Sequence, residues 1–133
     1  MEFKKITGEN GHIELQKVEM EDPNFESETP HIAHALFHNP KAVSYDYTAE
    51  LYLGKTVGNK VVTSGPQTFS LTAGQSKTVN FSVSMPRLTV PDDSFHVYLE
   101  VKHLGVLLIT FIGTEDVVVF VTPAIDVTEI TWD

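Results

Sequence analysis

Six of the 133 residues are histidines, and three of them, His31, His34 and His38, lie close together in the sequence. On a helix, His34 and His38 would share one face and could bind one metal ion. On a strand they would lie about 13 Å apart, too far for a zinc ion whose bonds to nitrogen are about 2.1 Å long. Pro30 and Asn39-Pro40 flank the segment and favour a strand. The sequence therefore predicts solvent-facing strand histidines, which would make this face sensitive to mild acid.

Two acidic pairs, Asp92-Asp93 and Glu115-Asp116, are the candidates for binding a hard cation. Calcium takes six to eight oxygen ligands, and the sequence has no EF-hand spacing. Loop acids of an acidic protein are usually solvated. We therefore expect no cofactor, and we keep Asp92, Asp93, Glu115 and Asp116 as the positions at which calcium would bind.

Nucleophilic catalysis finds little support in the sequence. There are no cysteines, and no serine lies in the Gly-x-Ser-x-Gly turn that holds a nucleophile between a strand and a helix. No glycine-rich loop precedes a helix, so a phosphate-binding loop is not indicated either. We expect a protein that is not an enzyme.

Charge and hydropathy exclude two classes of partner. The formal net charge is -9, and a surface of that sign repels nucleic acid and anionic lipid headgroups. The longest apolar stretches, 105–113 and 117–121, fall short of the roughly 20 residues that span a bilayer as a helix. Residues 1–11 lack the pattern of a secretory signal peptide. We expect neither nucleic-acid binding nor membrane insertion, and the compartment stays open.

Apolar residues recur with a period of two through most of the chain, which is typical of strands with one buried face. Residues 44–53 and 95–102 are the clearest cases. In the first strand the apolar residues change parity, which predicts a bulge or a change of sheet near Gln16 and Lys17. The predicted strands are 12–20, 31–39, 44–53, 60–63, 67–71, 76–85, 95–103, 106–112, 117–122 and 125–132.

These strands, separated by Gly, Pro and Asn turns, predict an all-β protein, an immunoglobulin-like antiparallel β-sandwich of the Greek-key type. We expect an N-terminal extension at 1–11, one sandwich domain at 12–122 and a strand-like tail at 123–133. Residues 22–30, rich in acid, Ser and Pro, are expected to be a connection.

The segments Phe37-His38-Asn39-Pro40, 47–54 and 69–81 together resemble CARDB-like, or bacterial adhesion-type, immunoglobulin-like domains. The most specific part is Leu71 to Phe81, with its Leu-x-Ala-Gly-x-Ser-x-x-Val-x-Phe spacing, and the resemblance covers about 12–122. The chain departs from the pattern at Pro91-Asp92-Asp93-Ser94, where these modules commonly carry a glycine before the aromatic residue that starts the sixth strand. The resemblance implies a spacer, adhesion or assembly module of a cell surface or virion, without catalytic residues.

A short self-similarity points to association between copies or neighbouring domains. Residues 13–19 and 125–131 share the order apolar, acidic, apolar, polar, charged, apolar, polar. The tail is thus expected to add as a strand to a neighbour, or alternatively to fold back on its own sheet. The expected interface residues are Ile125, Val127, Ile130 and Trp132, joined by Leu108 and Phe111 from a late strand that is apolar on both faces.

Binding of a carbohydrate or another ligand is the alternative function. If the strands at 44–53 and 95–103 are neighbours in one sheet, Glu50, Tyr52, His96 and Tyr98 lie together on its outer face. Aromatic rings among polar groups suit glycan or protein contact because they add contact area at little entropic cost. The competing interpretation is an ordinary hydrated sheet face.

Overall fold

The computed structural model describes residues 2–8, 13–20 and 24–121. These ranges contain strands and turns, and none of their segments forms a helix long and apolar enough to cross a membrane. The strands are β1 (Phe3–Gly8), β2 (Glu14–Glu19), β3 (Asn24–Glu26), β4 (Pro30–His38), β5 (Tyr45–Gly54), β6 (Val62–Thr63), β7 (Gln67–Leu71), β8 (Ser76–Ser84), β9 (Asp92–His103), β10 (Val106–Gly113) and β11 (Val117–Phe120).

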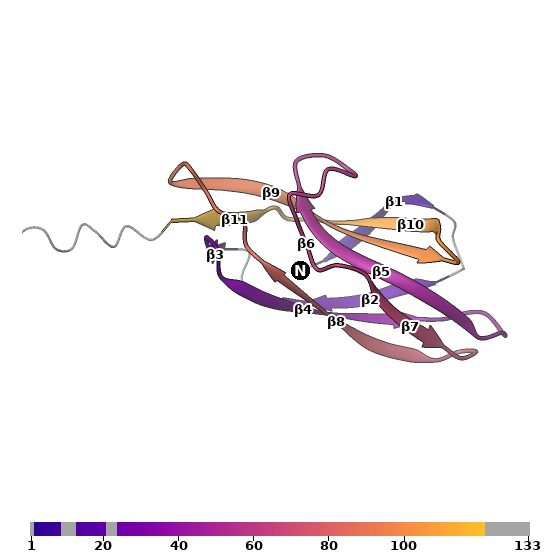
Figure 1. Ribbon diagram of the computed structural model, residues 1–133. Coiled ribbons are helices and arrows are strands. Elements are labelled where there is room, and N and C mark those ends of the chain that lie inside the picture. Colours follow the sequence, from indigo (N-terminus) through magenta and orange to yellow (C-terminus); the bar gives the residue numbers. More distant parts are fainter. Residues whose placement is uncertain (1, 9–12, 21–23, 122–133) are drawn as a thin grey trace, which may run out of the picture.

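The strands form two facing sheets (Figure 1). In the larger sheet β9 is central: β5 pairs with one of its edges, while β11 and β10 pair in succession along the other. Strands β6 and β7 extend this sheet beyond β5, and β1 extends it beyond β10. The smaller sheet has the order β2-β4-β8. All pairs are antiparallel except β3 with β11.

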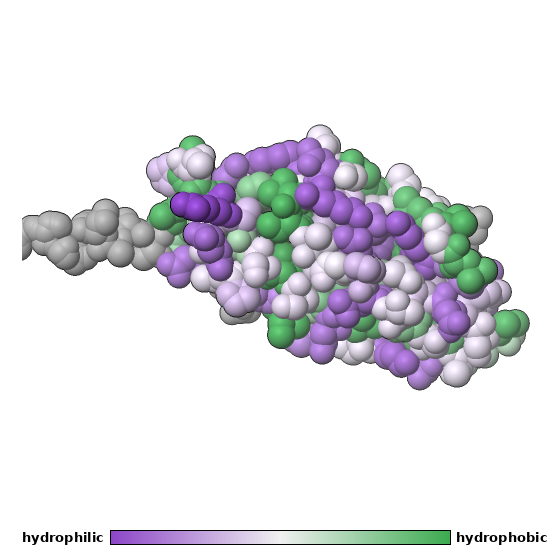
Figure 2. All heavy atoms as spheres, viewed as in Figure 1, coloured by the Kyte–Doolittle hydropathy of each residue, from purple (hydrophilic) through white to green (hydrophobic). Residues whose placement is uncertain are grey.

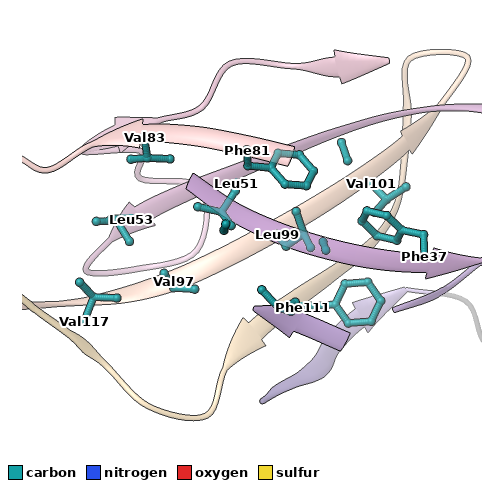
Figure 3. Packing of buried hydrophobic residues seen from close by; sticks show 14 of the residues in the cluster. Phe37, Leu51, Leu53, Phe81, Val83, Val97, Leu99, Val101, Phe111 and Val117 are labelled. Carbon is teal, nitrogen blue, oxygen red and sulfur yellow. The ribbon is translucent and has the colours of Figure 1, made fainter. Parts of the chain in front are cut away.

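The space between the sheets is filled by the inward-facing residues of strands with period-two alternation (Figure 3). From β5 and β9 these include Leu51, Val97 and Leu99, which are at most 1% exposed, and from the facing sheet Phe37 and Phe81, which are fully buried. Each such side chain contributes roughly 1.5–3 kcal/mol by leaving water. This confirms the predicted all-β sandwich.

One end of the sandwich is fixed by Asn39, which is fully buried just after β4. Its side-chain nitrogen donates hydrogen bonds to the carbonyl oxygens of Val43, Leu71 and Thr72 at 2.8, 3.2 and 3.2 Å. Its side-chain oxygen accepts one from the Lys41 amide at 2.9 Å. A single amide thus joins the loop after β4 to the turn after β7, which explains an asparagine at this turn.

The surface at the same end includes the β9–β10 turn, and hydrophobic atoms gather there in Figure 2. Leu104, Val106 and Leu107 are 85%, 64% and 51% exposed. Leu104 also has a backbone φ of 51°, a left-handed conformation that costs a residue with a side chain about 1–2 kcal/mol. An exposed leucine in such a conformation is not explained by the packing of this domain.

Three further expectations concern the first strands of the chain. The pairing of β2 with β4 shifts register between Leu15 and Lys17, which confirms the predicted irregularity. The expectation that 1–11 lies outside the domain is wrong for Phe3–Gly8, because this segment is β1 and pairs with β10. The predicted connection at 22–30 contains β3, which pairs with β11.

Strand β10 has apolar residues at both odd and even positions, and its pairing with β9 explains the change. A register shift between Leu107 and Ile109 changes which parity faces inward, so that Ile109 and Phe111 are buried and Leu108 packs partly against the core. Phe111 therefore belongs to the domain's own core and Leu108 is partly buried beside it, while the expectation that these two residues form an intermolecular interface stays a prediction. The tail residues Ile125, Val127, Ile130 and Trp132 lie outside the described residues.

Candidate functional site

The outer face of β5 and β9 has the pairing expected from the sequence. Tyr52 lies opposite Tyr98, Glu50 opposite Glu100, and Gly54 opposite His96. The Tyr52 and Tyr98 rings stack, with centroids 5.1 Å apart and an interplanar angle of 26°. The four predicted ligand-binding residues, Glu50, Tyr52, His96 and Tyr98, are thus brought together.

The two tyrosine rings are nevertheless covered. Tyr52 is 1% exposed and Tyr98 is 3% exposed, and burial raises the pKa of both phenols. The loop between β5 and β6 folds back over them, since the Gly58 amide donates a hydrogen bond of 3.0 Å to the Tyr52 hydroxyl and Lys60 Nζ lies 5.2 Å from the ring centroid. The expectation that these rings are available for glycan or protein contact is therefore wrong for this conformation of the loop.

Gly54 permits this loop conformation. A Cβ at position 54 would lie 1.9 Å from the backbone oxygen of Asn59, closer than atoms can approach. The end of β5 therefore requires glycine. The predicted strand 44–53 stops just before Gly54, and the structure shows that this glycine also allows the loop to close over the tyrosines.

Beside the tyrosines lies a small charge network. Lys60 Nζ is 3.1 Å from a carboxylate oxygen of Glu50 and 3.2 Å from one of Glu100. Burial alone would raise the pKa of Glu50, but hydrogen bonds from Thr63 and Lys60 outweigh it and lower that pKa. Burial would lower the pKa of Lys60, and the two carboxylates raise it. The lysine therefore offsets the repulsion between the two carboxylates.

The four residues proposed for calcium do not gather into one site. Asp93 accepts a hydrogen bond of 2.5 Å from Lys55, which lowers the pKa of its carboxyl. Asp116 lies 2.8 Å from the His96 ring nitrogen. Asp92 faces Phe120 at the start of β9, and Glu115 lies in the loop before β11. Among the described residues no three His, Asp or Glu side chains come together as a metal site.

The histidine trio lies on β4, as the strand interpretation predicts. His34 and His38 are on the outer face, where their ring nitrogens lie 2.5 Å from Asn80 and 3.0 Å from Ser76 of the neighbouring strand β8. His31 and His38 are both partly buried, but His31 differs because it has the parity of the inward-facing residues of β4 and its ring centroid lies 4.4 Å from that of Phe25. The expectation of three solvent-facing histidines thus applies to two of them.

A cleft that the sequence did not reveal lies between the edges of the two sheets. It has a volume of about 690 Å³ and is lined by Glu2 and Phe3 at the start of β1 and by residues 15–20, in and just after β2, so that polar and charged side chains form part of its wall. Apolar side chains in its wall include Phe3, Leu15, Val18 and Met20. Sequence reasoning missed it because the wall formed by β1 was assigned to an extension.

A second cavity lies between the sheets and is lined by core residues of both, among them Leu53, Phe81 and Val117. Its volume is about 10 Å³, which is close to the space of one water molecule. This cavity is too small for an organic ligand. Of the two spaces, the cleft between β1 and β2 is the one with room for another molecule or chain segment.

No family model and no curated protein sequence matches the chain. Two solved structures are similar to it. The C-terminal domain of Wzt shares 9% sequence identity with a TM-score of 0.59, and the match covers 90% of this chain and 78% of that one. A Niemann-Pick type C2 protein from the Japanese carpenter ant shares 12% identity with a TM-score of 0.50, over 92% of this chain and 100% of the other.

At such low identity these likenesses bear on the fold alone. The resemblance to CARDB-like domains stays a prediction. Together, the two facing sheets and the similar structures identify the chain as an immunoglobulin-like β-sandwich.

Proposed function

We propose that this protein is a non-catalytic assembly module that joins neighbouring copies or domains by strand addition, with residues 125–132 as the added strand. The observation that carries the proposal is a match between these residues and β2. Ile13, Leu15, Val18 and Met20 have the same spacing as Ile125, Val127, Ile130 and Trp132. Both sets change parity between the second and third apolar residue.

The structure explains why this spacing is informative. The first and third apolar residues of the β2 set, Ile13 and Val18, are 3% and 5% exposed, and Leu15 and Met20 pack partly against the core. The parity change corresponds to the register shift against β4. A bulged strand that keeps both halves of its apolar set inward needs this spacing. Residues 125–132 have this same spacing of apolar residues, which is the spacing found in β2 at the edge of the smaller sheet.

The cleft between β1 and β2 supports the proposal with a place for such a strand. It offers apolar side chains between two sheet edges, and a strand laid there would add backbone hydrogen bonds to side-chain burial. Apolar residues at alternate positions of the segment would give specificity. The resemblance to CARDB-like modules is consistent with an adhesion or assembly role at a cell surface or in a virion.

The alternative function, binding of a carbohydrate at Tyr52 and Tyr98, is less well supported. The rings are covered by the β5–β6 loop, so a ligand would first have to displace Gly58 and Lys60. No observation on the described residues favours that opening.

The proposal is tested with a chain shortened to residues 1–123 and a synthetic peptide of residues 123–133, by calorimetric titration and amide chemical-shift mapping. We expect saturable binding, with shifts concentrated in β1, β2 and β4. Absence of binding, together with unchanged self-association of the shortened chain, would refute strand addition by this segment.

A peptide lacking Thr128 is the matched control. It keeps all four apolar residues but places them at strictly alternating positions, without the parity change. If the segment binds with the bulge of β2, this peptide binds at least about fivefold more weakly, since in a bulged strand its evenly alternating apolar residues would turn to the other face beyond the bulge. Equal binding by both peptides would indicate nonspecific apolar association and contradict the proposal.

A further inference from the structure

One side of the sandwich is almost without charge. Charged residues make up 20% of the chain, yet Lys77 is the single one between Val61 and Pro86. This stretch contains β6, β7 and β8, and β7 and β8 lie side by side along the lower edge in Figure 1. The surface over them in Figure 2 is largely near-white, the colour of intermediate hydropathy. In a protein of net charge -9, two copies can meet on such a side with little repulsion.

Strand β8 is also the least protected edge of the smaller sheet. It pairs with β4 through nine consecutive residues without a register shift, and the described residues place no strand on its other side. The opposite edge, β2, has a bulge and carries Glu14, Lys17 and Glu19. Bulges and charges are the devices by which proteins prevent edge-to-edge pairing. In β8 the single charge is Lys77, whose Nζ donates to the Ser70 carbonyl of its own chain.

The outward face of β8 suits pairing with a second β8. Its exposed side chains are small and polar, namely Ser76, Thr78, Asn80, Ser82 and Ser84. In an antiparallel pair of two β8 strands with full overlap, residues whose numbers sum to 160 lie opposite each other. Thr78 then meets Ser82 of the second copy, Val79 meets Phe81, and Lys77 meets Val83. Such Thr–Ser and apolar pairs are favourable across strands, and no like charges face each other.

We infer that β8 is a self-association edge, at which two copies of the chain pair antiparallel about Asn80 and join their three-stranded sheets into one of six strands. The segment 125–132 is a poorer occupant of this edge, because its parity change does not suit the regular register of β8. This contact is therefore separate from the strand addition proposed above.

Charge variants at position 80 test the inference in the full chain. On the two-fold axis, Asn80→Lys places two ammonium groups opposite each other, and Asn80→Asp places two carboxylates there. Sedimentation equilibrium across a concentration series is expected to show dimer dissociation constants raised at least about tenfold for each variant alone. A one-to-one mixture of the two variants is expected to form a heterodimer and to recover association.

Asn24→Lys is the matched control, since it makes the same exposed asparagine-to-lysine change on β3, which belongs to the larger sheet and is part neither of β8 nor of the cleft lining. It should leave the dissociation constant of the dimer unchanged. Circular dichroism and thermal unfolding of every variant establish that the fold is kept. A monomeric wild-type chain at high concentration, or a mixture that fails to associate better than either variant, would overturn the inference.

Deletion of residues 124–133 distinguishes the β8 contact from strand addition by residues 125–132. If that deletion abolishes self-association while Asn80→Lys leaves it intact, the β8 contact is refuted and strand addition by 125–132 stands. If Asn80→Lys abolishes it while the deletion has no effect, the β8 contact stands and strand addition fails.

Discussion

Glu50 and Glu100 lie directly opposite each other on β5 and β9, and both side chains are largely buried, at 16% and 11% exposed. Like charges at opposite positions of neighbouring strands destabilise a sheet. Lys60 offsets this because it donates to both carboxylates. The lysine is supplied by the β5–β6 loop, so closing the loop over the tyrosines also places the compensating charge.

Replacing Lys60 with Met should therefore lower the free energy of unfolding at pH 7 by about 1 to 3 kcal/mol, since two partly buried carboxylates lose their partner. Chemical denaturation measures the difference. Lys102→Met is the control: Lys102 Nζ is 3.7 Å from Glu100 and its side chain is 41% exposed, so its loss should cost no more than about 0.5 kcal/mol. Equal effects of the two variants would contradict the bridging role of Lys60.

The difference in unfolding free energy between the wild type and Lys60→Met is expected to depend on pH. The pKa of Glu50 is lowered from 4.5 in the folded protein, so Glu50 contributes stability that is present above pH 4.5 and is lost as the pH falls through its lowered folded value. Lys60→Met removes part of that contribution. The stability difference between wild type and variant should be largest near neutral pH and should narrow below about pH 4. A difference that widens on acidification would exclude this explanation.

Asn39 offers a second prediction because its buried amide makes hydrogen bonds to three carbonyl oxygens. Asn39→Ala should cost about 2 to 4 kcal/mol of stability, because these carbonyls lose their donor. Asn39→Asp should cost more at pH 7, because a carboxylate would face the carbonyl oxygens, and the gap between the two variants should narrow as the aspartate is protonated. Denaturation at pH 7 and pH 4 tests both statements; an aspartate variant as stable as wild type would refute them.

Replacing Leu104 is expected to stabilise the protein, in contrast to the substitutions above. Its φ of 51° and 85% exposure mean that the side chain adds strain and little packing. Leu104→Gly should raise the free energy of unfolding by about 0.5 to 1 kcal/mol. Val106→Gly, two residues later at the start of β10, should instead lower it, because glycine favours a strand less than valine does. If both substitutions destabilise the protein, the backbone at Leu104 is not strained as described.

Much of the architecture is visible in the sequence because it is encoded locally. Period-two alternation at 44–53 and 95–102, the turns at Asn39-Pro40 and Gly54, and the parity change near Gln16 are properties of single segments, and the structure has strands, turns and a register shift at these positions. The sequence leaves open whether the strands at 44–53 and 95–103 are neighbours, and the structure supplies both their pairing and the register that sets Tyr52 opposite Tyr98.

Other features depend on segments far apart in the sequence. Strand β1 is too short and too polar to be recognised alone, and it becomes a strand because β10 provides a partner. The same holds for β3 beside β11. The sequence by itself determined which face of each long strand is apolar. Only the tertiary structure decided which polar face is covered, because the burial of Tyr52 and Tyr98 results from a loop whose position is set by contacts with residues distant along the chain.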